Sequence, residues 1–75
     1  MFEEIKSLLV EEMSIDESEI KEDAEFINDL GFNSLEIADL VALCEDKYEI
    51  DLDEDKIREI TTVGDFIKYL ESLVG

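Results

Sequence analysis

The stretch GFNSLEIADL, residues 31–40, places a single serine, Ser34, where a helical pattern begins. A glycine and an asparagine precede it, and both residue types are typical of turns and helix ends. As a helix cap, Ser34 would accept a hydrogen bond from a free backbone N–H of the first turn. As an attachment point, it would hold its hydroxyl at the positive end of the helix dipole, where a phosphodiester is favoured. Local sequence leaves both uses open.

Few other residues have the chemistry for catalysis. The chain has no histidine and one cysteine, Cys44, which excludes Ser-His-Asp and Cys-His nucleophiles as well as zinc sites. Cys44 lies among apolar residues at helical spacing and is expected to be a small hydrophobic core residue. The glycines are scattered and form no phosphate-binding loop.

The segment after residue 50 contains aspartates at alternate positions, Asp51, Asp53 and Asp55, as a calcium-binding loop does. The rest of that pattern fails, because Lys56 stands where the loop needs glycine and Thr62 where it needs glutamate. We therefore expect no dedicated metal site, and at most loose binding of divalent cations.

Charge and size limit the class of protein. The chain carries 23 acidic and 6 basic residues, a net charge of −17, which disfavours binding to nucleic acid or anionic lipid and favours basic partners. Its 75 residues are expected to form one domain, residues 1–75, and a monomer. No apolar run reaches the roughly 18 residues of a membrane span, and no signal peptide is evident. A single cysteine fits the cytoplasm.

Apolar spacing predicts an all-α fold, a small four-helix bundle of three main helices and one short helix with a long first loop. The main helices are expected at 3–13, from Ser34 to about Tyr48, and after a cap at Thr62, with Asp65 three residues on. A short helical segment is expected at 53–59.

The long first loop, residues 14–33, is polar with isolated apolar residues. A loop of this length in so small a domain should be tied to the core. We expect a helical turn at 14–19, with Ser14 and Glu17 forming a capping box. The residues expected to be anchored in the core are Ile15, Ile20, Phe26, Ile27 and Leu30.

The second helix should have a mixed outward face. Leu35, Asp39, Ala42, Asp46 and Glu49 lie opposite the stripe of Ile37, Leu40, Val41, Cys44 and Tyr48, with Glu36, Ala38, Leu43 and Glu45 beside them. Acidic residues that frame apolar ones are typical of a docking surface. A merely solvated face is the alternative, because single exposed apolar residues are common.

Two segments, LGFNSLEIADLVALCEDKYEIDL and ITTVGDFIKYL, resemble the acyl carrier protein family. In that family the serine of a Leu-Gly-x-Asp-Ser-Leu motif carries 4′-phosphopantetheine. The motif reads Leu-Gly-Phe-Asn-Ser-Leu over residues 30–35 here, and the resemblance covers essentially the whole chain.

The resemblance implies that Ser34 receives phosphopantetheine from coenzyme A through a separate Mg²⁺-dependent phosphopantetheinyl transferase. The chain would then carry acyl groups as thioesters for fatty acid synthesis without being an enzyme. Its partners would be acyl-transfer, ketosynthase, reductase and dehydratase enzymes with basic surfaces. The positions that match partner contacts are Leu35, Glu36, Asp39, Ala42, Glu45, Asp46 and Glu54. The candidates for a core that opens around an acyl chain are Phe26, Leu40, Cys44, Leu52, Ile57, Ile60 and Phe66.

Two features depart from or refine the resemblance. Asn33 replaces the aspartate of the motif, which keeps the capping chemistry but loses a negative charge toward the transferase. The bulk of Phe66, if it points inward, predicts short or medium acyl groups. The alternatives are a specialised carrier for polyketide, nonribosomal peptide, lipid-modification or D-alanyl pathways, and an acidic helical interaction module without the prosthetic group.

Overall fold

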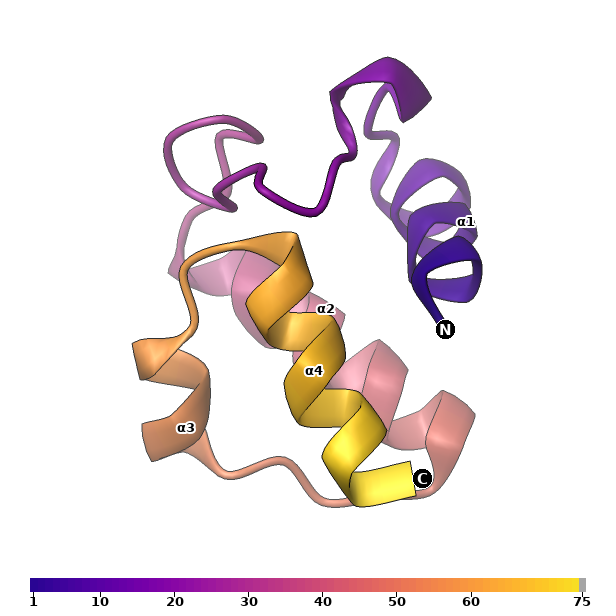
Figure 1. Ribbon diagram of the computed structural model, residues 1–75, viewed down its shortest axis with the longest axis vertical. Helices are drawn as coiled ribbons and strands as arrows, with labels where there is room; N and C mark the ends of the chain where they lie inside the picture. The colour runs from indigo at the N-terminus through magenta and orange to yellow at the C-terminus, as the bar shows by residue number, and fades with distance from the viewer. Residues whose placement is uncertain (75) are drawn as a thin grey trace.

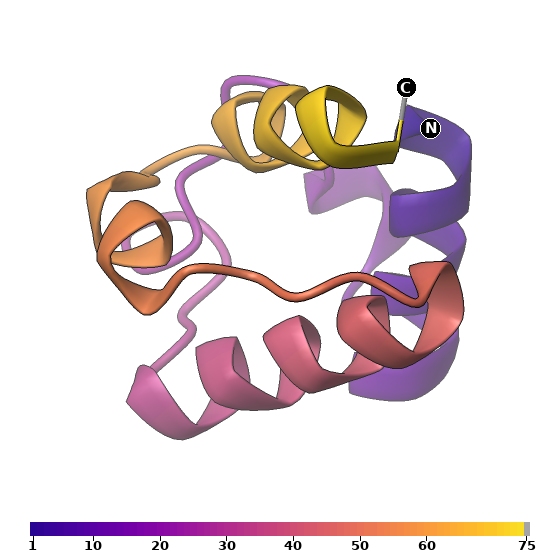
Figure 2. The ribbon, with the colours of Figure 1, turned by 90° about the horizontal axis from the view of Figure 1, so that it is seen from below.

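The computed structural model describes residues 1–74, which form four α-helices and one 3₁₀ turn. The elements in chain order are α1 (Phe2–Met13), η1 (Glu17–Glu19), α2 (Ser34–Tyr48), α3 (Glu54–Glu59) and α4 (Val63–Val74). Helices α2 and α4 face each other across the molecule, with α1 on one flank and the short α3 on the other (Figures 1 and 2). The predicted all-α bundle with a long first loop is confirmed.

The helices α1, α2 and α4 share one apolar core. Leu40 and Cys44 enter it from α2, and α4 contributes a broader face of Val63, Phe66, Ile67 and Leu70. Helix α1 adds Ile5, Leu8 and Leu9, at the spacing that places them on one side of a helix. In contrast, no side chain of α3 is fully buried, and Ile57 is only partly covered. Helix α3 is therefore the most weakly anchored of the four.

The turn predicted near residues 14–19 is present, but its predicted capping is wrong. Ser14 ends α1 in the left-handed conformation, with φ of 57°, and its N–H donates to the Leu9 carbonyl. Asp16 caps η1 instead, accepting hydrogen bonds from the backbone N–H of Ser18 at 3.0 Å and its hydroxyl at 2.9 Å. Because α1 continues through Met13, Ser14 is used at the end of that helix and cannot begin the next turn.

The long first loop is ordered by contacts with the start of α4. Phe26 N–H donates to the Thr61 carbonyl at 3.0 Å, and Val63 N–H donates to the Ala24 carbonyl at 2.9 Å. Of the expected anchors, Ile20 and Phe26 are buried and Ile15 and Leu30 are partly covered, but Ile27 is 63% exposed, so that prediction is wrong. Two further anchors are Ala24 and Phe32, which sequence patterns did not single out.

The loop also approaches the backbone of α4 closely. Gly64 N–H donates to the Glu22 carbonyl at 2.8 Å, and a Cβ added at Gly64 would lie 2.9 Å from that oxygen. Thr62 caps α4 as predicted, since its hydroxyl oxygen accepts the Asp65 N–H at 3.1 Å. Among residues 1–74, no return bond from the Asp65 side chain completes a capping box. The cap and the glycine together fix where the loop meets α4.

Candidate functional site

The start of α2 separates the two possible uses of Ser34. Asn33, not Ser34, is the helix cap: its side-chain oxygen accepts the Glu36 N–H at 3.0 Å, and the Glu36 carboxylate accepts the Asn33 N–H at 3.3 Å. Ser34 is the first residue of the helix proper and is exposed. Within the described part of the chain, its hydroxyl makes no hydrogen bond. The hydroxyl is therefore free for a covalent partner, beside backbone N–H groups at a helix N-terminus that favours negative charge.

Ser34 lies in a groove of about 640 Å³ between α2 and α3. The groove is lined on the α2 side by Ile37, Ala38, Val41, Ala42 and Glu45, on the α3 side by Glu54, Ile57, Arg58 and Ile60, and by Ile27 of the long loop. Its walls are mostly apolar, with a charged side chain, Glu45, on α2 and two, Glu54 and Arg58, on α3. This arrangement suits a flexible chain attached to the serine, which would lie against apolar side chains.

Behind the groove is a small cavity of about 20 Å³. Its lining includes five of the residues proposed for an acyl-binding core, namely Phe26, Leu40, Ile57, Ile60 and Phe66. Ile37 and Val41, expected only as part of the buried stripe, complete the lining. Cys44 and Leu52 are buried, but they do not border this cavity. The space would hold about one water molecule, so an acyl chain can enter only if the core expands.

The groove and the cavity share one wall. Ile37 and Val41 from α2, with Ile57 and Ile60 from the α3 region, line both spaces. The far side of the cavity contains the ring pair of Phe26 and Phe66, packed edge to face with centroids 5.7 Å apart. Phe66 is 2% exposed and therefore points inward. The prediction of short or medium acyl groups required this orientation.

The side chains expected to contact partners differ in exposure and in whether they already make hydrogen bonds within the fold. Leu35 is 77% exposed, and the side chains of Asp39, Ala42, Asp46 and Glu54 are also exposed. Two acidic positions already have structural partners. Glu36 is part of the capping box, and the Glu45 carboxylate accepts the Leu52 N–H at 2.9 Å, which holds the α2–α3 linker.

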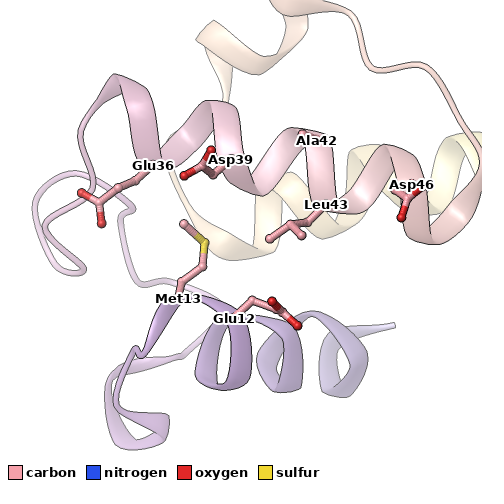
Figure 3. A pocket seen from close by; sticks show the side chains of 7 residues that line it. All are labelled: Glu12, Met13, Glu36, Asp39, Ala42, Leu43 and Asp46. Carbon is pink, nitrogen blue, oxygen red and sulfur yellow. The ribbon is translucent and has the colours of Figure 1, made fainter.

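The other flank of α2 borders a second groove, of about 490 Å³, between α2 and α1 (Figure 3). Glu36, Asp39 and Asp46 follow one another along its α2 edge, and Glu12 lies on α1. Met13 and Leu43 point into the space between the two helices. Leu43, expected beside the outward face, is instead partly buried against the core. The serine and this more acidic groove thus lie on different flanks of α2.

Two further candidates for chemistry, Cys44 and Asp53, have structural roles. Burial raises the pKa of the Cys44 thiol to about 11, so the thiol stays protonated and unreactive near neutral pH. Asp53, one of the alternating aspartates, caps α3 by accepting the Asp55 N–H at 2.9 Å. In the described residues, no group of three or more potential metal ligands gathers. No helix of residues 1–74 is long and apolar enough to cross a membrane.

The chain is similar to known proteins in both sequence and fold. Residues 3–70 match the family model described as "Phosphopantetheine attachment site". An acyl carrier protein of Sulfurovum sp. is 38% identical over 73 residues, covering 97% of both chains. An acyl carrier protein of Wolinella succinogenes is 36% identical over 72 residues, covering 96% of this chain and 95% of the relative. The crystal structure of an acyl carrier protein from Thermotoga maritima superposes with a TM-score of 0.82 at 27% identity, over 93% of this chain and 81% of that one.

The match extends from the first turn of α1 to the middle of α4, so it includes both flanks of α2 and the serine between them. The relatives and the shared fold indicate one class of protein, and the exposed serine that does not cap α2 fits that class. The chain belongs to the acyl carrier protein family, whose members hold their cargo on phosphopantetheine.

Proposed function

We propose that Ser34 is the residue that carries 4′-phosphopantetheine. The observation that carries this proposal is the capping box of Asn33 and Glu36, because it satisfies the helix start without the serine hydroxyl. The residues present fit the group. An exposed hydroxyl can form the phosphodiester, the helix N-terminus favours its negative charge, and the groove beside it has apolar walls.

When bound, the prosthetic group supplies a thiol on a flexible arm, to which an acyl group is joined as a thioester. The chain itself holds and shelters this cargo and has no catalytic activity of its own. Ile37, Val41, Ile57 and Ile60 form the boundary between groove and cavity, and we propose that an acyl chain passes between them. Phe26 and Phe66 then limit the depth of the site, which favours short or medium acyl groups.

The partners we propose are a phosphopantetheinyl transferase and the acyl-transfer, ketosynthase, reductase and dehydratase enzymes of fatty acid synthesis. Exposed Leu35 and Ala42 supply apolar contacts, and Asp39, Asp46 and Glu54 attract basic partner surfaces. Glu36 and Glu45 contribute charge from fixed positions. A monomeric chain in the cytoplasm fits a net charge of −17 and one reduced, buried cysteine.

The test is the intact mass of the protein after incubation with coenzyme A, Mg²⁺ and a broad-specificity phosphopantetheinyl transferase. The parent should gain the mass of one phosphopantetheinyl group, and Ser34→Ala should gain none. Ser7→Ala is the matched control, because Ser7 is also an exposed helical serine and lies in α1. Mass gain on Ser34→Ala would place the attachment elsewhere.

A parent that gains no mass leads to the same experiment on Asn33→Asp. Modification of that variant would show that Asn33 selects a dedicated transferase, because aspartate keeps the cap and restores the charge. If neither protein is modified, the proposal fails. The acidic interaction module without a prosthetic group would then be the better description of this chain.

A further inference from the structure

Ile27 is an apolar residue that the fold holds outside its core. Its side chain is 63% exposed, whereas neighbouring Phe26 is 5% exposed and Phe32 is 3% exposed. These two rings pack together with centroids 5.5 Å apart and fix the segment on either side of Ile27. Because more than half of the Ile27 side chain is exposed, it adds little apolar burial to the fold. Single exposed apolar residues are common, so its position relative to Ser34 decides whether it has a function.

The exposure of Ile27 is not the result of a loose loop. The backbone around it is closed by hydrogen bonds from the N–H groups of residues 29 and 30 to the carbonyl of residue 25, at 2.9 and 3.0 Å. Phe32 N–H donates to the Phe26 carbonyl at 2.8 Å, and the Asp29 carboxylate accepts the Glu25 N–H at 2.8 Å. The turn of residues 25–32 therefore presents Ile27 in a fixed position, with little conformational entropy left to lose on binding.

Ile27 lines the same groove as Ser34. An enzyme that joins a group to Ser34 must bring its reacting atoms to within about 3–3.5 Å of the hydroxyl oxygen. Such an approach covers the surface around the serine, which includes Ile27 and the 77% exposed Leu35. The two apolar side chains come from different elements, the long loop and α2. Glu45 and Glu54 line the groove with Arg58, so negative charge exceeds positive charge there.

We propose that Ile27 is an apolar docking contact for the phosphopantetheinyl transferase that modifies Ser34. This inference rests on the proposed function and adds the long loop to the surface that α2 supplies. The partner surface that fits has an apolar recess for Ile27 with Lys or Arg at its edge, facing the carboxylates of the groove. Because Ile27 contacts the partner and not the reacting atoms, it contributes to docking and not to the chemical step.

The experiment measures the rate of modification against the concentration of apo-protein, with coenzyme A, Mg²⁺ and the same transferase. Ile27→Gln should raise KM about tenfold and leave kcat nearly unchanged, because the substitution removes most of one apolar contact. Ile27→Leu keeps the apolar volume and should restore a KM near that of the parent. Leu73→Gln is the matched control, because Leu73 is also apolar and exposed, at 43%, but lies in the last turn of α4 outside the groove.

The outcomes separate this inference from the proposed function. Equal KM values for Ile27→Gln, Leu73→Gln and the parent would overturn the inference that Ile27 contacts the transferase. A raised KM that Ile27→Leu fails to restore would also overturn it, because the contact would then not depend on apolar volume. If neither the parent nor Asn33→Asp is modified at Ser34, the proposed function itself fails, and the mass measurement detects this before any KM is determined.

Discussion

The capping box at the start of α2 predicts that truncation lowers stability at Asn33 but not at the adjacent Ser34. Asn33→Ala removes the oxygen that accepts the Glu36 N–H at 3.0 Å. This hydrogen bond is exposed, so the Glu36 N–H can still bind water in the variant. Loss of a cap of this kind costs about 1 kcal/mol of unfolding free energy. In a domain of this size, that corresponds to a fall in melting temperature of about 4–8 °C.

Ser34→Ala should behave differently although the residue is the next in sequence. The Ser34 hydroxyl makes no hydrogen bond in residues 1–74, and alanine is the better helix former. We expect the unfolding free energy of the apo-protein to be unchanged or to rise by at most about 0.5 kcal/mol. Asn33→Asp keeps the cap and adds a charge that the helix dipole favours, so it should be at least as stable as the parent at physiological ionic strength.

The measurement is thermal and urea unfolding of the apo-proteins, followed by circular dichroism. The reasoning is refuted if Ser34→Ala loses as much stability as Asn33→Ala, because the serine would then be the cap. It is equally refuted if Asn33→Ala melts with the parent. A double variant, Asn33→Ala with Ser34→Ala, should lose no more than Asn33→Ala alone.

Four other outcomes are expected. Gly64→Ala should lower the urea midpoint, by about 1–3 kcal/mol in unfolding free energy, because its Cβ would lie 2.9 Å from the Glu22 carbonyl; an unchanged midpoint would contradict the packing described. Burial raises the pKa of the Cys44 thiol from 9.0 to about 11. The buried neutral thiol therefore contributes its full stability below pH 9.0, and this contribution is lost as the pH rises from 9.0 to about 11. Near neutral pH, alkylation of Cys44, measured by mass, should require unfolding. Phe66→Leu should enlarge the cavity behind the groove and shift the acyl length that gives the greatest rise in melting temperature of the loaded protein toward longer chains; an unshifted optimum would show that Phe66 does not set the depth. Added salt or Mg²⁺ should raise the melting temperature, since a net charge of −17 repels itself, and a melting temperature indifferent to ionic strength would argue against this.

Helix positions were predictable because the core-facing residues of α1, α2 and α4 keep helical spacing in sequence. The cap of α2 was also available from the sequence. Asn33 has a glutamate three residues on, as a capping box requires, whereas the residue three after Ser34 is Ile37. The same rule misled at Ser14. Spacing correctly placed the end of the first helix at residue 13, but it could not show that Ser14 adopts the left-handed conformation that ends α1.

The direction of loop side chains was not predictable in the same way. No period relates Phe26, Ile27 and Phe32, so the sequence could not show that the rings turn inward and the isoleucine outward. Their positions depend on the bonds between the loop and the start of α4, which join residues more than 30 apart in sequence. The boundary of the cavity was missed in part for a related reason. Ile37 and Val41 were expected in the core, but their place between two spaces depends on α3.

The weak anchoring of α3 has a consequence for how a loaded carrier is distinguished from an empty one. A guest that enlarges the cavity must displace its most easily moved wall, and that wall includes Ile57 of a six-residue helix with no fully buried side chain. Glu54 and Arg58 belong to the same helix and border the outer groove, so they move with it. The charge pattern beside Ser34 would then report the volume of a hidden cargo, and an enzyme could recognise the length of an acyl chain without touching it.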